Sequence, residues 1–168
     1  HENEIAQTCS LTGKPMAKYW LHNGFITINK EKMSKSLGNF FLLRDILEKF
    51  EPQTVRFYLL SVHYRSPLDF DDEKLEVAQK GLERLKNAYT ALNNGLRMTS
   101  AEADPAARQT LLAEVKQTEA AFQEAMDDDF NTADALAAVF ELVKFGNTNV
   151  QEGSSAEFAA HTLEVMTK

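Results

Sequence analysis

Residues 32–36, with the sequence KMSKS, place two cations and two hydroxyl groups just before a turn residue, Gly38. The ammonium groups of Lys32 and Lys35 can act as point charges on phosphate oxygens, and hydroxyls and turn amides add hydrogen-bond donors. A mobile loop of this composition would clamp a polyphosphate and stabilise the charge that develops on a leaving pyrophosphate. A charged loop whose lysines are simply solvated is the alternative interpretation.

Two other groups of polar residues have the right chemistry for metals. His1 and Glu4 are three residues apart, so on a helix they share one face. An imidazole and a carboxylate both suit Zn²⁺, although two polar residues at a helix start are the alternative. The acidic run 127–129 does not converge on one helix face, and we interpret it as a solvated linker or N-cap cluster. No Walker-type or G-x-G-x-x-G glycine loop is present, so a P-loop or Rossmann dinucleotide site is not supported.

The composition describes a globular chain of 168 residues, 43% hydrophobic and 26% charged, which fits one domain or two small ones. Residues 1–70 carry nine Lys or Arg and seven Asp or Glu, whereas residues 71–168 carry nine and eighteen. A basic footprint over the whole domain is therefore absent, and any nucleic acid would bind through local contacts. The single cysteine, Cys9, favours a reducing, cytoplasmic location, and no apolar run approaches the ~20 residues of a membrane span.

The residues around the KMSKS stretch predict short elements. Residues 1–7 can begin or continue a helix, Gly13 and Pro15 mark a turn, and residues 25–28 (FITI) lean toward a strand. We expect this strand to pair with a sheet outside the chain. Helices are expected over 41–50 and from Pro52 to residue 62, followed by an extended or looped segment over 63–72.

The remainder predicts an antiparallel bundle of three or four amphipathic helices. Apolar residues at spacings of three and four form a heptad seam over 73–94, namely Leu75, Ala78, Leu82, Leu85, Tyr89 and Leu92. A second helix begins at Asp104-Pro105, and a third is capped by Asn131 or Thr132. A fourth runs toward Lys168. Inward-facing residues are expected in the second and third helices, namely Leu111, Val115, Phe122, Met126, Leu136, Phe140 and Val143.

The order of several motifs resembles the bacterial cysteinyl-tRNA synthetases, a family of class I aminoacyl-tRNA synthetases. HENEIAQ (1–7), YWLHNG (19–24), EKMSKSLGNF (31–40), VRFYLLSVHYRSPLDF (55–70) and MDDDFNT (126–132) occur in this order. The likeness covers nearly all of the chain. It implies a mainly α fold, in which the end of a class I catalytic domain, with its KMSKS loop and a short strand, precedes an antiparallel helical bundle.

The resemblance also implies roles for individual residues. Lys32 and Lys35 are the expected catalytic residues, with Lys35 contacting ATP during adenylate formation. ATP-binding residues are expected in the same loop and beside it, namely Lys32, Met33, Ser34, Lys35, Ser36 and His22. A structural role for His22 is an open alternative, and Trp20 is expected to pack. Cys9 does not match a family ligand and is interpreted as a small, half-buried side chain.

The zinc site of the family is held by two cysteines, a histidine and the last glutamate of a His-His-Glu-Asn-Glu motif. That glutamate corresponds to Glu4, and the ligating histidine would precede His1. The other ligands are not matched in this chain, so we expect zinc in a full-length enzyme and none in this segment. In the family, zinc takes the thiolate of the substrate directly, which rejects serine without editing.

By this resemblance the intact enzyme would activate cysteine with ATP and Mg²⁺ to cysteinyl-adenylate and transfer it to tRNA(Cys). The expected organisation is a catalytic remnant over 1–40, connecting helices over 41–72 and a tRNA-contacting bundle over 73–168. The segment alone is expected to be inactive, because the first half of the active site is not matched, and a cytoplasmic monomer is expected. Two alternatives are a cysteine:amino-sugar ligase of mycothiol synthesis and a non-catalytic helical interaction module, although all five KMSKS positions are intact.

Overall fold

The computed structural model describes residues 1–98, 105–149, 160, 162 and 164. Most of these residues are helical, which confirms the expectation of a mainly α fold. The helices are α1 (Glu2–Thr12), α2 (Leu43–Leu47), α3 (Pro52–Leu60), α4 (Asp72–Met98), α5 (Pro105–Asp127) and α6 (Thr132–Asn149). Among the described residues, no helix is both long and apolar enough to span a bilayer.

A small sheet joins residues on both sides of the two short helices. Its strands are β1 (Ile26–Ile28), β2 (Glu31–Lys32) and β3 (Leu68–Asp69), in the order β2-β1-β3. β1 and β2 are antiparallel, and β1 and β3 are parallel. The hairpin turn is made by Asn29 and Lys30 with φ of 51° and 65°, the left-handed geometry that two-residue hairpins favour. The expectation that β1 finds its partners outside the chain is incomplete, because two strands within the chain pair with it.

An apolar core packs against this sheet. Tyr58 of α3 donates its hydroxyl hydrogen to the carbonyl of Asp69 at 2.6 Å, and the Phe41 and Phe70 rings lie 4.6 Å apart. The buried members come from α2, α3, the β3 region and the start of α4, namely Ile46, Val55, Tyr58, Leu68, Phe70, Leu75 and Ala78. The hairpin that leads into residues 32–36 therefore rests on the same core that receives α4.

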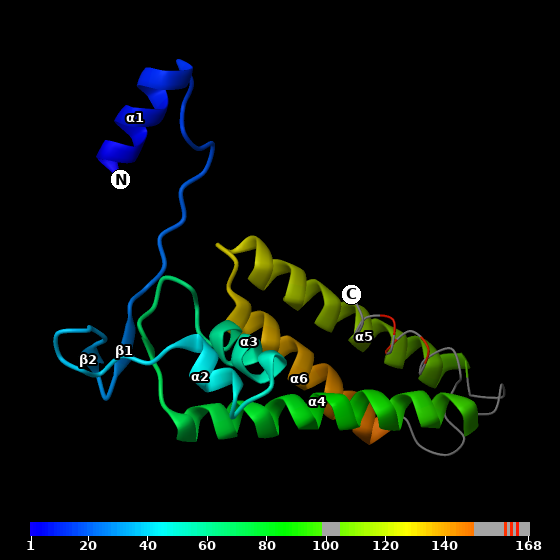
Figure 1. Cartoon of the computed structure of the whole chain (residues 1–168). Helices are drawn as coiled ribbons and strands as arrows, with labels where there is room; N and C mark the ends of the chain where they lie inside the picture. The colour runs from blue at the N-terminus through cyan, green and yellow to red at the C-terminus, as the bar shows by residue number, and fades with distance from the viewer. Residues whose placement is uncertain (99–104, 150–159, 161, 163, 165–168) are drawn as a thin grey trace.

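Helices α4, α5 and α6 form the expected antiparallel bundle, with α3 packed against α4 (Figure 1). Leu75, Ala78 and Leu92 of the predicted seam are buried, but Tyr89 is 42% exposed and Ala88 is buried in its place. The buried stripe of α4 therefore departs from the heptad positions at Tyr89 and returns to them at Leu92.

The other bundle helices match the predicted pattern in part. Val115 and Val143 are buried, whereas Phe122 is 38% exposed, so its expected inward position is wrong. α6 is capped, as expected, by Asn131, whose Oδ1 accepts the backbone N–H of Asp134 at 3.2 Å. The Leu111 side chain, Asp104 and most of the expected fourth helix lie outside the described residues.

Helix α1 stands apart from the bundle and joins the sheet through residues 13–25 (Figure 1). It ends at Gly13, which has φ of 66° and donates its N–H to the carbonyl of Cys9 at 2.9 Å. A left-handed glycine of this kind is a common helix terminator. Cys9 is partly buried, as expected.

Candidate functional site

The KMSKS loop, residues 32–36, leaves the sheet at the end of β2 and turns at once. Met33 donates its backbone N–H to the carbonyl of Ile26 at 3.4 Å, which keeps the start of the loop against β1. Gly38 has φ of 67° and donates its N–H to the carbonyl of Lys35 at 3.2 Å. Because this backbone conformation suits glycine, the GlyAsn sequence after the motif is what allows the chain to close a tight turn.

The turn is braced by the side chain of Asn39. Its Oδ1 accepts the backbone N–H of Ser34 at 2.9 Å, and its Nδ2 donates to the carbonyl of Lys32 at 3.3 Å. Inside the turn, the Ser34 hydroxyl lies 3.2 Å from the Ser36 hydroxyl and accepts the N–H of Leu37 at 3.3 Å. Sequence reasoning missed Asn39; an amide residue shortly after a glycine turn is the signal that points to it.

The two lysines of the loop are in different environments. The Lys32 ammonium group lies 5.0 Å from the centre of the Phe25 ring, a cation–π arrangement. Lys35 is exposed on the turn, and among the described residues no acceptor contacts its ammonium group. Lys35 is thus a cation presented on a turn whose backbone is already hydrogen-bonded, next to the two serine hydroxyls.

A second brace holds the hairpin that carries the loop. The Asp69 carboxylate accepts hydrogen bonds from the Thr27 hydroxyl at 2.9 Å, the Lys30 backbone N–H at 2.8 Å and the Lys74 ammonium at 2.6 Å. The hydrogen bond from Lys74 is the main reason that the pKa of Asp69 falls to about 2, and the same contact raises the pKa of Lys74. Asp69 therefore fixes the hairpin turn to the start of α4.

His22 lies in an aromatic group at the surface, before the sheet begins. Its ring is stacked with Trp20 at 6.3 Å and an interplanar angle of 11°, and lies 5.3 Å from the ring of His1. His22 is exposed and Trp20 is 42% exposed. The packing expected for Trp20 is therefore a surface contact with two histidines, and the role of His22 toward ATP stays a prediction.

The predicted metal ligand Glu4 lies in the first turn of α1 and is exposed. Within the described part of the chain, no group of three or more His, Cys, Asp or Glu side chains is arranged to hold a metal ion. Glu4 thus offers one carboxylate near His1, and the residues present do not complete a zinc site. The assignment of Glu4 as a zinc ligand stays a prediction about a longer protein.

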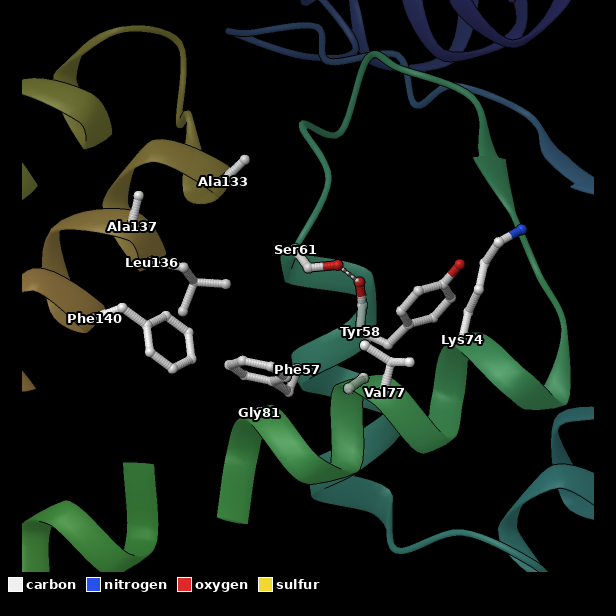
Figure 2. A pocket seen from close by; sticks show the side chains of 11 residues that line it. Phe57, Tyr58, Ser61, Lys74, Val77, Gly81, Ala133, Leu136, Ala137 and Phe140 are labelled. Carbon is white, nitrogen blue, oxygen red and sulfur yellow. Dashed lines mark hydrogen bonds between the residues drawn. The ribbon is translucent and has the colours of Figure 1, made fainter. Parts of the chain in front are cut away.

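A groove of about 470 Å³ lies between α3, α4 and α6 (Figure 2). Phe57 and Phe140 pack edge to face in it with ring centres 6.4 Å apart, and Lys74 points away from these rings (Figure 2). The lining is mostly apolar and contains a single ionisable ammonium group, which is engaged by Asp69. Its side chains suit helix packing, so the loop at residues 32–36 is the better candidate for chemistry.

Comparison with known families matches two parts of the chain. Residues 1–80 match a family described as the tRNA synthetases class I (C) catalytic domain, and residues 121–168 match the DALR domain. Residues 1–80 thus belong to the class I tRNA synthetase (C) catalytic-domain family, and the KMSKS loop lies within this match.

Within that class, the similar curated proteins are cysteine--tRNA ligases, as the motifs indicated. The chain is 55% identical over 157 residues to the Carboxydothermus hydrogenoformans protein, covering 92% of this chain and 32% of that relative. It is 51% identical over 163 residues to a Geobacillus sp. protein, covering 97% and 34%. The chain therefore spans about a third of the length of these relatives.

The fold also matches a solved synthetase structure. A LeuRS chain from Agrobacterium radiobacter K84, in a ternary complex titled LeuRS-tRNA-LeuAMS, superposes with a TM-score of 0.76. The match is 20% identical in sequence and covers 97% of this chain and 22% of that one. At this identity the match supports the fold alone, and it agrees with the class I assignment.

Proposed function

We propose that this chain is the ATP-loop and helical-domain segment of a cysteine--tRNA ligase. The full-length protein would activate cysteine with ATP to cysteinyl-adenylate, release pyrophosphate and transfer the cysteinyl group to tRNA. The observation that carries the proposal is the KMSKS loop itself, with Lys35 exposed and unpaired among the described residues on a turn braced by Asn39. We infer cysteine as the amino acid from the sequence identity of the chain to curated cysteine--tRNA ligases.

Each loop residue has a chemical role in this proposal. Lys35 would contact the phosphates, where its charge offsets the negative charge that develops as the bond to pyrophosphate breaks. Lys32 would add a second cation, whose ammonium group is oriented by its cation–π contact with the Phe25 ring. The hydroxyls of Ser34 and Ser36 and the backbone at Met33 would supply hydrogen-bonding groups to the nucleotide, and His22 would border it.

The proposed organisation keeps three functional segments. Residues 1–40 would carry the ATP loop, residues 41–72 would connect, and residues 73–168 would form the bundle that contacts tRNA. β3 of the middle segment pairs with β1 of the first, so the boundary near residue 40 divides functions and not folding units. The bundle is acidic overall, so its contact with the tRNA backbone would rest on a few local cations.

ATP, with Mg²⁺, and cysteine would be the small substrates, and zinc would be the resident metal of the longer protein. Zn²⁺ bound there would take the thiolate of the substrate cysteine. Glu4 would supply one carboxylate ligand, with the remaining ligands provided by parts of the protein beyond this chain. This chain's own contribution is the position of Glu4 in the first turn of α1.

The test is charging of tRNA by the full-length protein. With ATP, cysteine and tRNA(Cys), we expect cysteinyl-tRNA to form, and we expect no product when serine replaces cysteine or when ATP is omitted. Transfer of cysteine to an amino-sugar and not to tRNA would replace the proposal with the mycothiol-type ligase. Absence of both products would favour the non-catalytic interaction module.

A further inference from the structure

The acidic run at the turn between α5 and α6 contains a carboxylate, Asp129, that is bound by residues distant in the sequence. Asp129 accepts the Tyr64 hydroxyl hydrogen at 2.7 Å, and Arg65 donates to it from Nε at 2.5 Å and from Nη2 at 3.2 Å. His63 lies close, with its Nε2 3.9 Å from the same carboxylate. The expectation that this run is only a solvated linker or N-cap cluster is therefore wrong for Asp129.

The backbone of the turn explains why this particular aspartate reaches across. Asp129 and Phe130 have φ of 55° and 56°, a left-handed conformation that non-glycine residues seldom adopt. The carbonyls of Ala125 and Met126 at the end of α5 close the turn by accepting the N–H groups of Asn131 and Phe130. This reversal directs Asp129 away from α5 toward residues 63–65, whereas Asp127 stays over α5 and accepts from Gln123.

Residues 63–66 are in turn fixed to the segment that precedes β1. The backbone N–H of Gly24 donates to the carbonyl of Tyr64 at 2.7 Å. A Cβ at Gly24 would lie 2.1 Å from the carbonyl oxygen of Ser66, so the two backbones approach as closely as only glycine allows. Contacts therefore run from Asp129 in the bundle through Tyr64 and Arg65 to Gly24, two residues after His22.

We propose that Asp129 is a positioning residue that sets the register of the helical bundle against the catalytic segment. Arg65 and Tyr64 lie within the catalytic-domain match and Asp129 lies within the DALR match, so the contact joins the two matched regions directly. The bidentate arginine contact fixes direction as well as distance. The consequence for catalysis rests on the proposed function: this register would align tRNA held by the bundle with the aminoacyl-adenylate.

The charge state supports this role. Hydrogen bonds from Arg65 and then from Tyr64 hold the pKa of Asp129 at about 2, and the same contacts raise the pKa of both partners. The groups facing the carboxylate are thus a guanidinium, a phenol and the imidazole of His63. At neutral pH, Asp129 is therefore ionised and paired.

Asp129→Asn in the full-length protein tests the contact without breaking the turn, because asparagine tolerates the left-handed conformation. The new amide nitrogen cannot accept from Arg65, so the paired contact is lost. We expect amide hydrogen exchange at Gly24 and at residues 64–66 to accelerate about tenfold. Asp128→Asn is the matched control: Asp128 is exposed, and within the described residues its side chain has no hydrogen bond, so exchange should not change. Equal rates of amide hydrogen exchange at these positions in the two variants would overturn the proposal.

A kinetic arm separates positioning from general destabilisation. We expect Asp129→Asn to raise the KM for tRNA about tenfold while cysteine-dependent pyrophosphate exchange stays within about twofold of wild type. Asp129→Glu keeps a carboxylate that can pair with Arg65, so its KM for tRNA should lie between those of the wild type and of Asp129→Asn. A parallel fall in both activities would overturn the positioning role. If the wild-type protein shows neither activity, the proposed function fails, and the exchange measurement at Gly24 still decides whether Asp129 sets the register.

Discussion

The side-chain amide of Asn39 spans the KMSKS loop, accepting the backbone N–H of Ser34 at 2.9 Å and donating to the carbonyl of Lys32 at 3.3 Å. The side chain of Asn39 thereby ties residues 32 and 34, which enter the turn, to the residue that leaves it. Lys35 lies between Ser34 and Asn39 and is exposed. The loop thus combines a hydrogen-bonded frame with an exposed cation, an arrangement that would limit how much ordering must accompany the proposed binding of ATP.

Asn39→Asp tests the two hydrogen bonds of the Asn39 side chain separately. The aspartate can still accept the N–H of Ser34, but it cannot donate to the carbonyl of Lys32. We expect the rate constant of cysteine-dependent pyrophosphate exchange by the full-length protein to fall about tenfold, in line with the loss of one hydrogen bond. The KM for cysteine should not change, because this brace acts on the KMSKS loop, which we propose binds ATP. An unaltered rate constant would show that the brace does not position Lys35.

Gly24→Ala tests the close approach between the HNG segment and residues 63–66. A methyl group there would meet the carbonyl oxygen of Ser66 at 2.1 Å, so the backbones must separate. Overpacking of this kind typically costs ~1–3 kcal/mol, and the hydrogen bond from Gly24 to Tyr64 would be lost as well.

The matched control is Gly13→Ala, where no atom lies within 4 Å and only the φ of 66° is unfavourable. Thermal unfolding of the full-length protein should show a lower Tm for Gly24→Ala than for Gly13→Ala. The reverse order would mean that the contact with Ser66 is not formed in solution.

The ion pair between Asp69 and Lys74 predicts a pH dependence of stability. The pKa of Asp69 is lowered to about 2 from an ordinary 3.8. Its contribution is therefore complete above about pH 4 and is lost as the pH falls through about 2. The pKa of Lys74 is raised, so its contribution is complete below its ordinary pKa and is lost as the pH rises past it. Asp69→Asn should flatten the stability profile between pH 4 and 2, and a profile identical to wild type would contradict the pairing.

Glu4→Gln tests the metal assignment. A neutral amide is a weaker ligand for Zn²⁺ than a carboxylate. In the full-length protein we expect this change to lower the zinc content or, if the metal is retained, the affinity for cysteine. Glu2→Gln, which also lies in the first turn of α1, should leave both unchanged. Full zinc content and wild-type cysteine affinity in Glu4→Gln would remove Glu4 from the metal site.

The sequence predicted what depends on local pattern. Apolar spacing gave the helices of the bundle, and Asn131 was recognisable as a cap because it precedes its helix directly. Residues 63–72 were predicted as extended or looped, but the pairing of Leu68–Asp69 as strand β3 was not predicted, because two residues carry no alternation pattern. Phe122 was assigned inward because spacing gives the face of a helix but not how far its neighbours cover it.

Side chains whose partners are distant in the sequence could not be predicted. Asp129 meets Arg65 across 64 residues, and Asp69 meets Thr27 across 42. Nothing in the local sequence distinguishes Asp129 from Asp127 or from the residue between them. The distinction comes from two left-handed residues at the end of α5, which the composition of the turn does not require.

The central claim is that Lys35 acts on the phosphates of ATP during adenylate formation. The most direct measurement is cysteine-dependent exchange of pyrophosphate into ATP by the full-length protein, its Lys35→Ala variant and a Lys14→Ala control, an exposed lysine outside the loop. We predict exchange by the wild type, a decrease of ~10²–10³-fold in Lys35→Ala, an unchanged affinity for cysteine, and wild-type exchange in Lys14→Ala. Exchange by Lys35→Ala at the wild-type rate would contradict the account.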